Sequence, residues 1–375
     1  MRSRKNKTNL ILTLVFLAMI LLPGLGTFLG WDFYPAQDEN RKPAERPEWG
    51  KVSLAKYPEK FETWFYDHFG FRNTFIRYYN RTLRKSLNVQ APEVIFGEGE
   101  WLFYNEPSMM QDFLGKQPLN DNDLRVWRDK LIRTRTSLAN QGIVYRFVII
   151  PNKCNVYTEK LPLVLQQTES AIKRIEQLEA FLANTTAPQP LYLQDALQTA
   201  ARKELVYFPN DTHWTEAGSY IGYCEIIHSL QSDFPNLTPL SLKEFPRETS
   251  LHYGDLSGKL LGLGKENSVP RQQILPMNNR IKKKLEWLPD WTNGTHLSPV
   301  HAIISHNPDK KLGIVIFHDS FANYGLMPLI EATFRNVVFI QDRPDKLTMN
   351  AVVERFSPDI VIEERMERFL QKPDE

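Results

Sequence analysis

The sequence is poor in the features that mark several common classes of protein. Its 375 residues contain only two cysteines, Cys154 and Cys224, too few for a disulfide framework or, by themselves, a four-ligand zinc site. Its 46 basic and 44 acidic side chains almost cancel, which gives no electrostatic footprint for nucleic acid. A hydrophobic content of 42% excludes a disordered chain. The length suits one large or two ordinary domains.

The only hydrophobic stretch of membrane-spanning length lies at the N-terminus. Four basic residues, Arg2, Arg4, Lys5 and Lys7, precede an apolar run over residues 10–29. A helix of about 20 residues crosses a bilayer core about 30 Å thick, and flanking positive charge stays on the cytoplasmic side. We therefore expect a single-pass anchor in the inner (cytoplasmic) membrane, with the remaining chain periplasmic or extracellular. A cleaved signal peptide is the alternative, and it also exports the chain.

Beyond this tip and anchor (1–30), we expect a lead-in at 31–60, rich in proline and charge, and one large domain at 61–370. Helix is expected at 61–89 and a β-hairpin at 94–104. Further strands are expected at 143–150, 191–193, 312–317, 337–340 and 359–362, and helices at 121–141, 165–184, 215–230, 322–334 and 345–356. This alternation predicts an α/β fold in which helices cover both faces of a parallel sheet. Residues 235–310 are expected to form an irregular insertion over the sheet edge.

One loop suited to nucleophilic catalysis follows the expected strand at 312–317. It reads His318-Asp319-Ser320-Phe321 and leads into a helix, and functional loops gather at the carboxyl ends of parallel strands. A serine at such a turn exposes its hydroxyl, and the first amides of the helix can stabilise an oxyanion. The structural alternative is that Asp319 or Ser320 only caps the helix.

A second loop, Asp211-Thr212-His213-Trp214, also leads into a helix. An aspartate close to a histidine can orient the imidazole through one ring nitrogen and leave the other to take a proton from serine. Helix capping by Asp211 or Thr212 is again the alternative. Together the two loops provide a serine, a histidine and an aspartate, and this combination is more specific than either loop. Nothing in the pattern supports a catalytic metal.

Several further strings can be read together with these loops. They are Glu39-Asn40-Arg41, Asp67-His68-Phe69-Gly70-Phe71-Arg72, Trp101-Leu102-Phe103-Tyr104, Pro151-x-Lys153 with Val156-Tyr157, and Gly254-Asp255-Leu256. With the two loops, they make the chain resemble the SGNH hydrolase-like domain of the bacterial alginate O-acetyltransferase family (the AlgJ and AlgX type), in family order from residue 39 to about 368. The resemblance implies a three-layer α/β/α SGNH hydrolase-like domain and a role in exopolysaccharide biosynthesis, such as that of alginate.

The resemblance also implies roles for the loop residues. Ser320 would be the nucleophile, His213 its base and Asp211 the orienting acid. In this family the Asp-x-His segment precedes the serine, and this sequence has that order. The family usually has glycine two residues before the nucleophile, where this chain has His318. A side chain at that position would crowd the oxyanion site or add a donor to it.

Other residues are expected to bind substrate near the serine. They are Lys153, Tyr157, Trp287, Trp291, Asn323 and Tyr324. Asn323 and Tyr324 would assist the Ser320 amide at the oxyanion. Trp287 and Trp291 would stack on sugar rings, or alternatively form the core of the insertion. Lys153 and Tyr157 follow a strand and so face the same sheet edge, where they would shape the site, although Tyr157 is equally suited to a structural role.

The leading hypothesis is a membrane-anchored O-acetyltransferase that modifies an exported polysaccharide through an acetyl-serine intermediate. No cofactor is expected, because no acetyl-CoA site is readable. Acetyl groups would come from a partner, which the resemblance implies is a polytopic membrane-bound O-acyltransferase. The same triad equally serves an acetylesterase acting on the polysaccharide or on peptidoglycan. A non-catalytic polysaccharide-binding scaffold is the third hypothesis, and His318 favours it.

Overall fold

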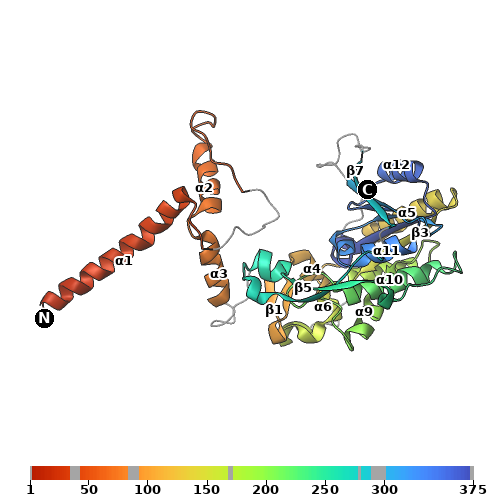
Figure 1. Ribbon diagram of the computed structural model, residues 1–375, viewed down its shortest axis with the longest axis horizontal. Coiled ribbons are helices and arrows are strands. Elements are labelled where there is room, and N and C mark those ends of the chain that lie inside the picture. The colour runs from red at the N-terminus through yellow and green to blue at the C-terminus, as the bar shows by residue number, and fades with distance from the viewer. Residues whose placement is uncertain are drawn as a thin grey trace. The chain divides into compact units, whose positions relative to one another are not determined.

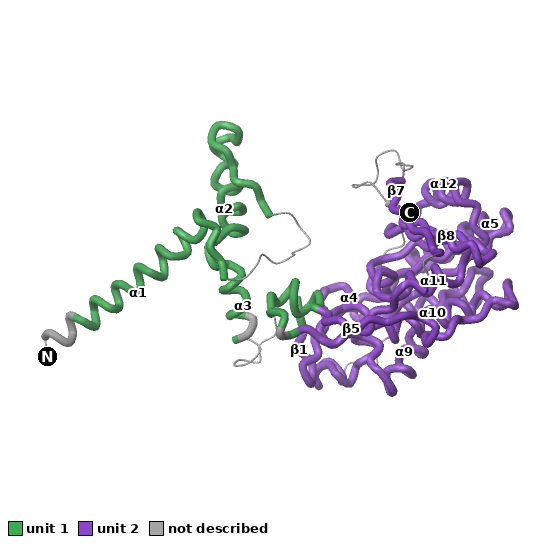
Figure 2. Tube along the Cα trace, in the orientation of Figure 1, with its two compact units in different colours: residues 1–94, 253–267 green, residues 95–252, 268–375 purple. Residues whose placement is uncertain are grey.

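The computed structural model describes residues 2–33, 43–82, 93–167, 172–277, 280–288 and 301–371. The chain divides into two compact units, shown in Figure 2. Unit 1 comprises residues 1–94 and 253–267, and unit 2 comprises residues 95–252 and 268–375. Unit 1 is helical in its described part, whereas unit 2 contains the large sheet.

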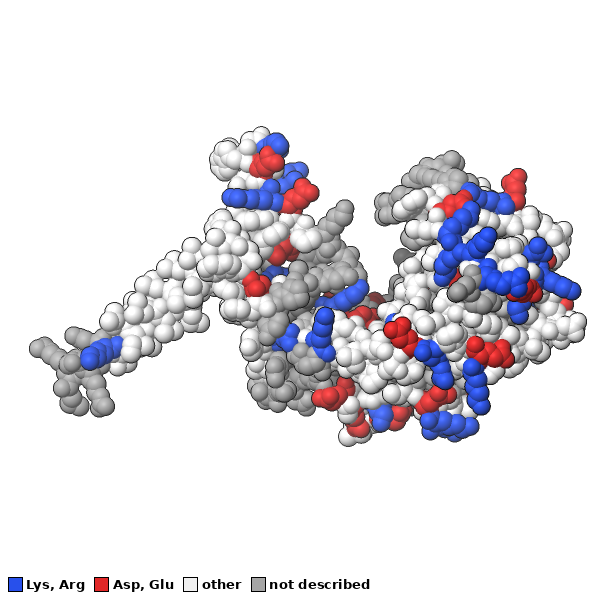
Figure 3. All heavy atoms as spheres, viewed as in Figure 1, with Lys and Arg blue, Asp and Glu red and all other residues white. Residues whose placement is uncertain are grey.

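Unit 1 begins with α1 (Arg2–Leu29), the long helix at the N-terminus in Figure 1. Its segment Lys7–Leu29, 23 residues, is long and apolar enough to cross a membrane. In Figure 3 the visible face of α1 is bare of charge along its length after its basic start. The predicted N-terminal apolar helix is therefore confirmed, and its length and composition suit a membrane anchor or a signal sequence alike.

Two shorter helices follow in unit 1, α2 (Tyr57–His68) and α3 (Arg72–Thr82). A single helix over 61–89 was predicted, and this is wrong because the chain turns between them with Phe71 at a φ of 62°. Gly70 lies so close to α1 that a Cβ atom there would be 2.4 Å from the Pro23 carbonyl oxygen. The Gly70 amide also donates to the Thr27 hydroxyl at 3.0 Å. The Asp-His-Phe-Gly-Phe-Arg string thus forms a turn packed against α1; residues 83–92 lie outside the described part.

Unit 2 is built on a seven-stranded sheet in the order β4-β3-β11-β9-β10-β8-β7. The strands are β3 (Val144–Ile150), β4 (Leu191–Tyr192), β7 (Lys282–Trp287), β8 (His301–His306), β9 (Gly313–Phe317), β10 (Asn336–Ile340) and β11 (Ile360–Met366). The strands from β4 to β10 in that order run parallel, as predicted. β8 and β7 extend the sheet in antiparallel pairing.

The expectation of an irregular insertion over residues 235–310 is therefore wrong. Besides β7 and β8, this region contains a second hairpin, β5 (Arg247–His252) paired with β6 (Val269–Ile274). β7 reads Lys-Lys-Lys-Leu-Glu-Trp and is mostly exposed. Charged side chains are typical of an edge strand, which has to avoid further pairing. Such a strand lacks the apolar alternation by which sequence reasoning recognises β-structure.

Helices cover both faces of the sheet, as predicted. They are α5 (Asp121–Ala139), α8 (Arg174–Leu182), α9 (Gln194–Ala201), α10 (Glu216–Leu230), α11 (Leu326–Thr333) and α12 (Lys346–Phe356). On β9, Ile314 and Ile316 pack into one core, which includes α9, α10 and α11. Val315 and Phe317 pack into the other core, which includes α5, α8 and α12. The three layers α/β/α follow from this burial of both faces of a parallel strand.

Local signals explain where several elements begin. Asn120 caps α5 and forms a capping box with Asp123, which is a strong helix start. The predicted helix over 322–334 instead begins as a 3-10 turn, Ser320–Asn323, and is interrupted by Gly325 at a φ of 87°. The helix predicted at 165–184 is divided into α7 (Leu163–Gln166) and α8. The expected hairpin consists of β1 (Val94–Phe96) and β2 (Leu102–Tyr104).

Candidate active site

The loop that carries Ser320 leaves the sheet at the carboxyl end of β9. Ser320 is the first residue of the 3-10 turn, and Asp319 caps this turn by accepting the Phe321 amide at 2.9 Å. The second carboxylate oxygen of Asp319 accepts the amide of Met366, on the neighbouring strand β11, at 2.8 Å. The capping interpretation is thus correct for Asp319. It fixes the turn to the sheet and leaves Ser320 to make a different contact.

That contact joins Ser320 to the second loop. The Ser320 hydroxyl lies 2.8 Å from Nε2 of His213, and Nδ1 of His213 lies 2.7 Å from Oδ1 of Asp211. An ionised carboxylate only accepts hydrogen bonds, so Nδ1 donates to Asp211 and Nε2 accepts from the serine. The cap of α10 is Thr215, which accepts the Gly218 amide at 3.2 Å. The structure therefore brings the three predicted side chains into one hydrogen-bonded chain.

Asp211 is ionised in this arrangement although only 1% of it is exposed. Burial by itself would raise the pKa of its carboxyl group. Hydrogen bonds from His213 and His252 outweigh burial and hold this pKa well below its usual value. A buried anion beside Nδ1 fixes the tautomer of His213 and stabilises the imidazolium that forms when Nε2 takes a proton.

His252 is a site residue that sequence reasoning missed. Its Nε2 atom lies 2.7 Å from Oδ2 of Asp211, and its ring stacks on Phe208 with centroids 4.1 Å apart. It is the last residue of β5, in the region predicted to be irregular. Because Asp211 lies 41 residues away, no short motif links the two residues. Only recognition of the β5–β6 hairpin would have pointed to it.

Lys153 and Tyr157, which were expected to shape the site and bind substrate, are both buried, and for Tyr157 this agrees with the structural alternative. The Lys153 ammonium donates to the carbonyl oxygens of Phe208, Pro209 and Asp211 at 3.1, 3.3 and 2.5 Å. The short helix α6 (Lys153–Val156) turns this side chain inward, where it holds the loop that carries Asp211. The Tyr157 hydroxyl accepts the Val206 amide at 3.0 Å, and its ring packs on Trp101. Both residues therefore support the loops from within.

Tyr324 and Asn323 lie beside the nucleophile, as their sequence positions require. The Tyr324 ring stacks on the His213 imidazole, with centroids 4.0 Å apart and planes at 15°. Phe321 lies 4.8 Å from the same imidazole. Asn323 is exposed, and its amide nitrogen is 3.5 Å from the Gln341 side-chain oxygen. His213 is thus restrained by two aromatic rings, and Asn323 is the side chain open to solvent.

His318 is buried and turned toward its own loop. Its Nδ1 lies 2.6 Å from the carbonyl oxygen of Asp319, and a carbonyl only accepts, so Nδ1 carries the proton. The ring meets Phe339 edge-on, with centroids 5.7 Å apart. His318 and Asp319 also line a cavity of about 440 Å³, with Arg343 and Arg365 among its other walls. This cavity borders the nucleophile's loop, because His318 and Asp319 are among its walls.

The two tryptophans expected to stack on sugars differ in what the structure shows. Trp291 lies outside the described residues. Trp287 ends β7 and is 63% exposed. It pairs with His301, and the next residue of β8, Ala302, pairs with Ile340 at the end of β10. Trp287 is therefore at the same edge of the sheet as the end of β9, three strands along from it.

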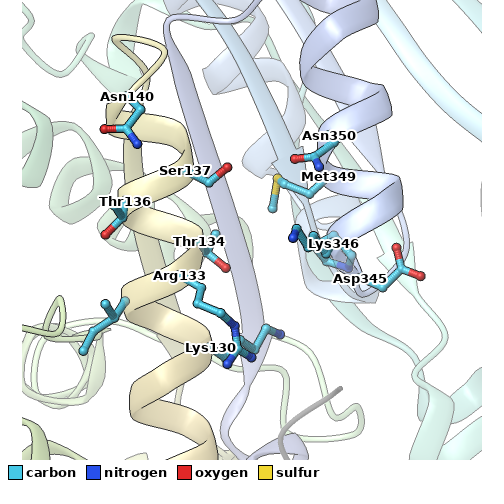
Figure 4. Close-up of a pocket in the computed structure, with 12 residues that line it drawn as sticks. Lys130, Arg133, Thr134, Thr136, Ser137, Asn140, Asp345, Lys346, Met349 and Asn350 are labelled. Atoms are coloured by element: carbon cyan, nitrogen blue, oxygen red, sulfur yellow. The ribbon is translucent and has the colours of Figure 1, made fainter.

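A second cavity, of about 490 Å³, lies between α5 and α12. Figure 4 shows its walls, with Lys130 and Arg133 on α5 facing Lys346 and Asn350 on α12. Its lining includes no residue of the loop that carries Ser320, whereas the cavity of about 440 Å³ includes His318 and Asp319 of that loop. This cavity belongs to the helical layer opposite α10 and α11.

Comparisons with known proteins agree with this architecture. Residues 94–286 match the family model described as SGNH hydrolase-like domain, acetyltransferase AlgX. No curated protein matches the chain. Bacillus cereus PatB1 is similar in structure at 12% identity and a TM-score of 0.51, over 75% of this chain and 98% of that chain. A DHHW family protein from Eubacterium siraeum is similar at 13% identity and a TM-score of 0.51, over 76% and 96%. The O-acetyltransferase domain of Pseudomonas putida AlgJ is 19% identical, with a TM-score of 0.46, over 76% and 94%.

The family match covers more than half of the 375 residues. It includes Asp211, His213 and His252, whereas Ser320 lies beyond its end. The fold is an SGNH hydrolase-like α/β fold with a mostly parallel sheet, and the family supports an acetyltransferase or esterase type of activity. The chain belongs to the AlgX family of SGNH hydrolase-like acetyltransferases.

Proposed function

We propose that this protein transfers acetyl groups onto hydroxyl groups of an exported polysaccharide, with Ser320 as the nucleophile. One observation carries the proposal: Ser320, His213 and Asp211 are linked at 2.8 and 2.7 Å in the order that nucleophilic catalysis requires. Membership of an acetyltransferase family supports acetyl as the transferred group. Membership of this family also supports a polysaccharide as the acceptor.

The first half-reaction forms an acetyl-enzyme. Oγ of Ser320 attacks the acetyl carbonyl carbon of the donor ester while its proton passes to Nε2 of His213. The oxyanion of the tetrahedral intermediate is stabilised by the Ser320 amide at the start of the 3-10 turn. The intermediate collapses, the bond from carbonyl carbon to donor oxygen breaks, and His213 gives its proton to that oxygen. The acetyl group remains as an ester on Ser320.

The second half-reaction passes the acetyl group to the polymer. An acceptor hydroxyl gives its proton to Nε2 of His213 and attacks the acetyl-Ser320 carbonyl carbon. The ester bond to Oγ breaks, and Oγ takes the proton from His213. Asp211 stays ionised throughout and balances the charge of the imidazolium. Free enzyme and an acetylated sugar result, and no cofactor takes part in these steps.

The acceptor site in this proposal is the cavity of about 440 Å³ beside His318 and Asp319. Its volume is in the range of about 300 to 1,000 Å³ that small-molecule sites occupy. Exposed Asn323 and Trp287, together with Trp291, supply the further contacts with sugar, because an aromatic face and an amide both suit a sugar ring. Water has to be kept from acetyl-Ser320, and a bound acceptor chain would do this by occupying the approach to Oγ.

In the same proposal, residues 1–30 anchor the protein by a single pass in the cytoplasmic membrane. Residues 31–60 then lead to a periplasmic domain at 61–370. The apolar segment Lys7–Leu29 and the basic residues before it support this orientation. The acetyl groups come from a polytopic membrane-bound O-acyltransferase, because acetyl-CoA is cytoplasmic whereas the triad faces the other side.

The test uses full-length protein in detergent with p-nitrophenyl acetate as donor and an acceptor oligosaccharide. We expect acetylated sugar, and an acetyl adduct on the Ser320 peptide when the acceptor is omitted. Ser320→Ala should lose both, whereas Ser229→Ala on α10 should retain both. Free acetate without acetylated sugar would show an esterase. If neither free acetate nor acetylated sugar forms, the result would instead support a non-catalytic polysaccharide-binding scaffold.

A further inference from the structure

The carboxylate of Asp211 binds a histidine on each of its two oxygens. Oδ1 lies 2.7 Å from Nδ1 of His213, and Oδ2 lies 2.7 Å from Nε2 of His252. All three side chains are buried. An ionised carboxylate removed from water needs a donor for each oxygen. His252 supplies the donor that the serine, histidine and aspartate alone do not provide.

His252 is held in place by groups other than Asp211. One face of its ring stacks on Phe208, with centroids 4.1 Å apart. Tyr324 meets the ring edge-on at 5.8 Å and 89°. The carbonyl oxygen of His252 accepts the Asn210 side-chain amide at 3.4 Å. Because these contacts fix the His252 ring, the direction of its Nε2–H bond is fixed too. This bond therefore sets the orientation of the Asp211 carboxylate.

The β5–β6 hairpin brings a second side chain to the same place. Arg271 on β6 pairs with Ser250 on β5, and its guanidinium lies over the Tyr324 ring, 5.3 Å from the centroid. Arg271 also donates to Glu216, at the start of α10, at 2.5 Å. Tyr324 in turn stacks on His213. The hairpin therefore supports the catalytic imidazole by two routes, through Asp211 and through Tyr324.

The orientation of the Asp211 carboxylate matters because Oδ1 performs two tasks. It accepts both the His213 ring N–H and the His213 backbone amide, at 2.7 and 2.8 Å. Rotation of the carboxylate would weaken both bonds together. A donor fixed on Oδ2 opposes this rotation and keeps Oδ1 directed at His213.

We infer that His252 is a positioning residue for acyl transfer, whose Nε2–H holds the Asp211 carboxylate so that Oδ1 faces His213. The inference rests on the proposed function of the triad. It gives the β5–β6 hairpin a role in catalysis, beyond the roles of Ser320, His213 and Asp211. The role is orientation and charge dispersal, with no proton transferred through His252.

The test compares His252→Leu with His252→Gln in full-length protein in detergent. Leucine fills space but cannot donate, whereas the glutamine amide can donate to Oδ2. We expect His252→Leu to lower kcat for p-nitrophenyl acetate about 10- to 100-fold, the value of a hydrogen bond to a charged group, with KM changed less than about twofold. His252→Gln should recover most of kcat. His228→Leu, on exposed α10 surface, is the matched control and should match wild type.

A spectroscopic readout separates positioning from folding and from activity. The proton shared by His213 and Asp211 is followed by NMR with 15N-histidine labelling. We expect its downfield signal to shift or broaden in His252→Leu and to return in His252→Gln. Wild-type kcat and an unchanged signal in His252→Leu would overturn the inference. Equal losses in both variants, with unchanged melting temperatures, would also overturn it.

The two proposals fail differently. If Ser320→Ala keeps full activity, the proposed function is wrong, whatever His252 does. If Ser320→Ala is inactive while His252→Leu equals wild type in both readouts, only the role of His252 is wrong. If His252→Leu does not fold, the Gln variant decides: loss of kcat and of the NMR signal in folded His252→Gln overturns the donor role, and their retention supports it.

Discussion

The indole N–H of Trp214 donates a hydrogen bond to the carbonyl oxygen of Phe321 at 3.0 Å. This bond spans 107 residues of sequence and joins the loop of His213 to the loop of Ser320. The two partners directly follow the two residues that have to meet. The distance between His213 and Ser320 is thus set by their neighbours as well as by their own hydrogen bond.

Trp214→Phe should therefore misplace the base relative to the nucleophile. The smaller phenyl ring would fill only part of this buried site, and the donor to Phe321 would be gone. A neutral hydrogen bond contributes about 1 kcal/mol and the cavity adds to this loss, so we expect a stability loss of about 1 to 3 kcal/mol and a fall in kcat of up to about tenfold, with KM little changed. Steady-state kinetics and thermal melting measure these effects. Trp49→Phe, at an exposed position, should change neither, and an unaltered kcat in Trp214→Phe would contradict the argument.

Lys153→Met should lower stability and kcat together. The ammonium binds three carbonyl oxygens of the Asp211 loop and lies over the rings of Trp101 and Phe103. Methionine keeps the aliphatic stem but leaves those carbonyls without this donor, at an expected cost of about 2 to 4 kcal/mol. Denaturant titration and kinetics are the measurements. A raised KM at unchanged stability and kcat would instead indicate direct contact with substrate, as the sequence position had suggested.

These residues also show how far the sequence could predict the site. Ser320 and the Asp211–His213 pair were predictable because each lies at a junction between strand-like and helix-like segments, where side chains face the sheet edge. The position of Lys153 after a strand was equally visible, but its direction depends on the short helix α6, which no periodicity reveals. The position of His252 and the edge strand β7 both depend on long-range pairing between exposed, charged segments. Local hydrophobic patterns therefore could not predict either of them.

Glu367→Gln should alter the pH dependence of stability. Glu367 is fully buried, and burial together with the Asp112 charge raises its pKa to about 7, from 4.5. The folded state therefore holds a proton that the unfolded state has lost, and stability declines as the pH rises from about 4.5 to about 7. The variant removes this decline while one amide oxygen can still accept from Asn152 and Asn155, as Oε2 does now.

Thermal melting at several pH values checks this prediction. We expect wild type and Glu367→Gln to melt alike near pH 4.5. Above pH 7 the variant should be more stable, by at most about 3.5 kcal/mol, since one pKa unit corresponds to about 1.4 kcal/mol and the pKa of Glu367 is raised from 4.5 to about 7. Glu354→Gln on the exposed side of α12 is the control and should follow wild type. A constant difference between Glu367→Gln and wild type at every pH would show that packing, and not the proton, is responsible.

Arg343→Ala should separate acceptor binding from acetyl-enzyme formation. Arg343 is exposed and lines the cavity beside His318 and Asp319, where the proposal places the acceptor. Loss of a charged donor there should raise KM for an acceptor oligosaccharide about tenfold, while the rate of Ser320 acetylation without acceptor stays unchanged. Arg133→Ala removes a positive charge from the cavity between α5 and α12. It should change neither the KM for the acceptor nor the rate of Ser320 acetylation. An acceptor KM that responds to Arg133 and not to Arg343 would move the acceptor site to the α5–α12 cavity, because only the lining of the occupied cavity can contribute to acceptor binding.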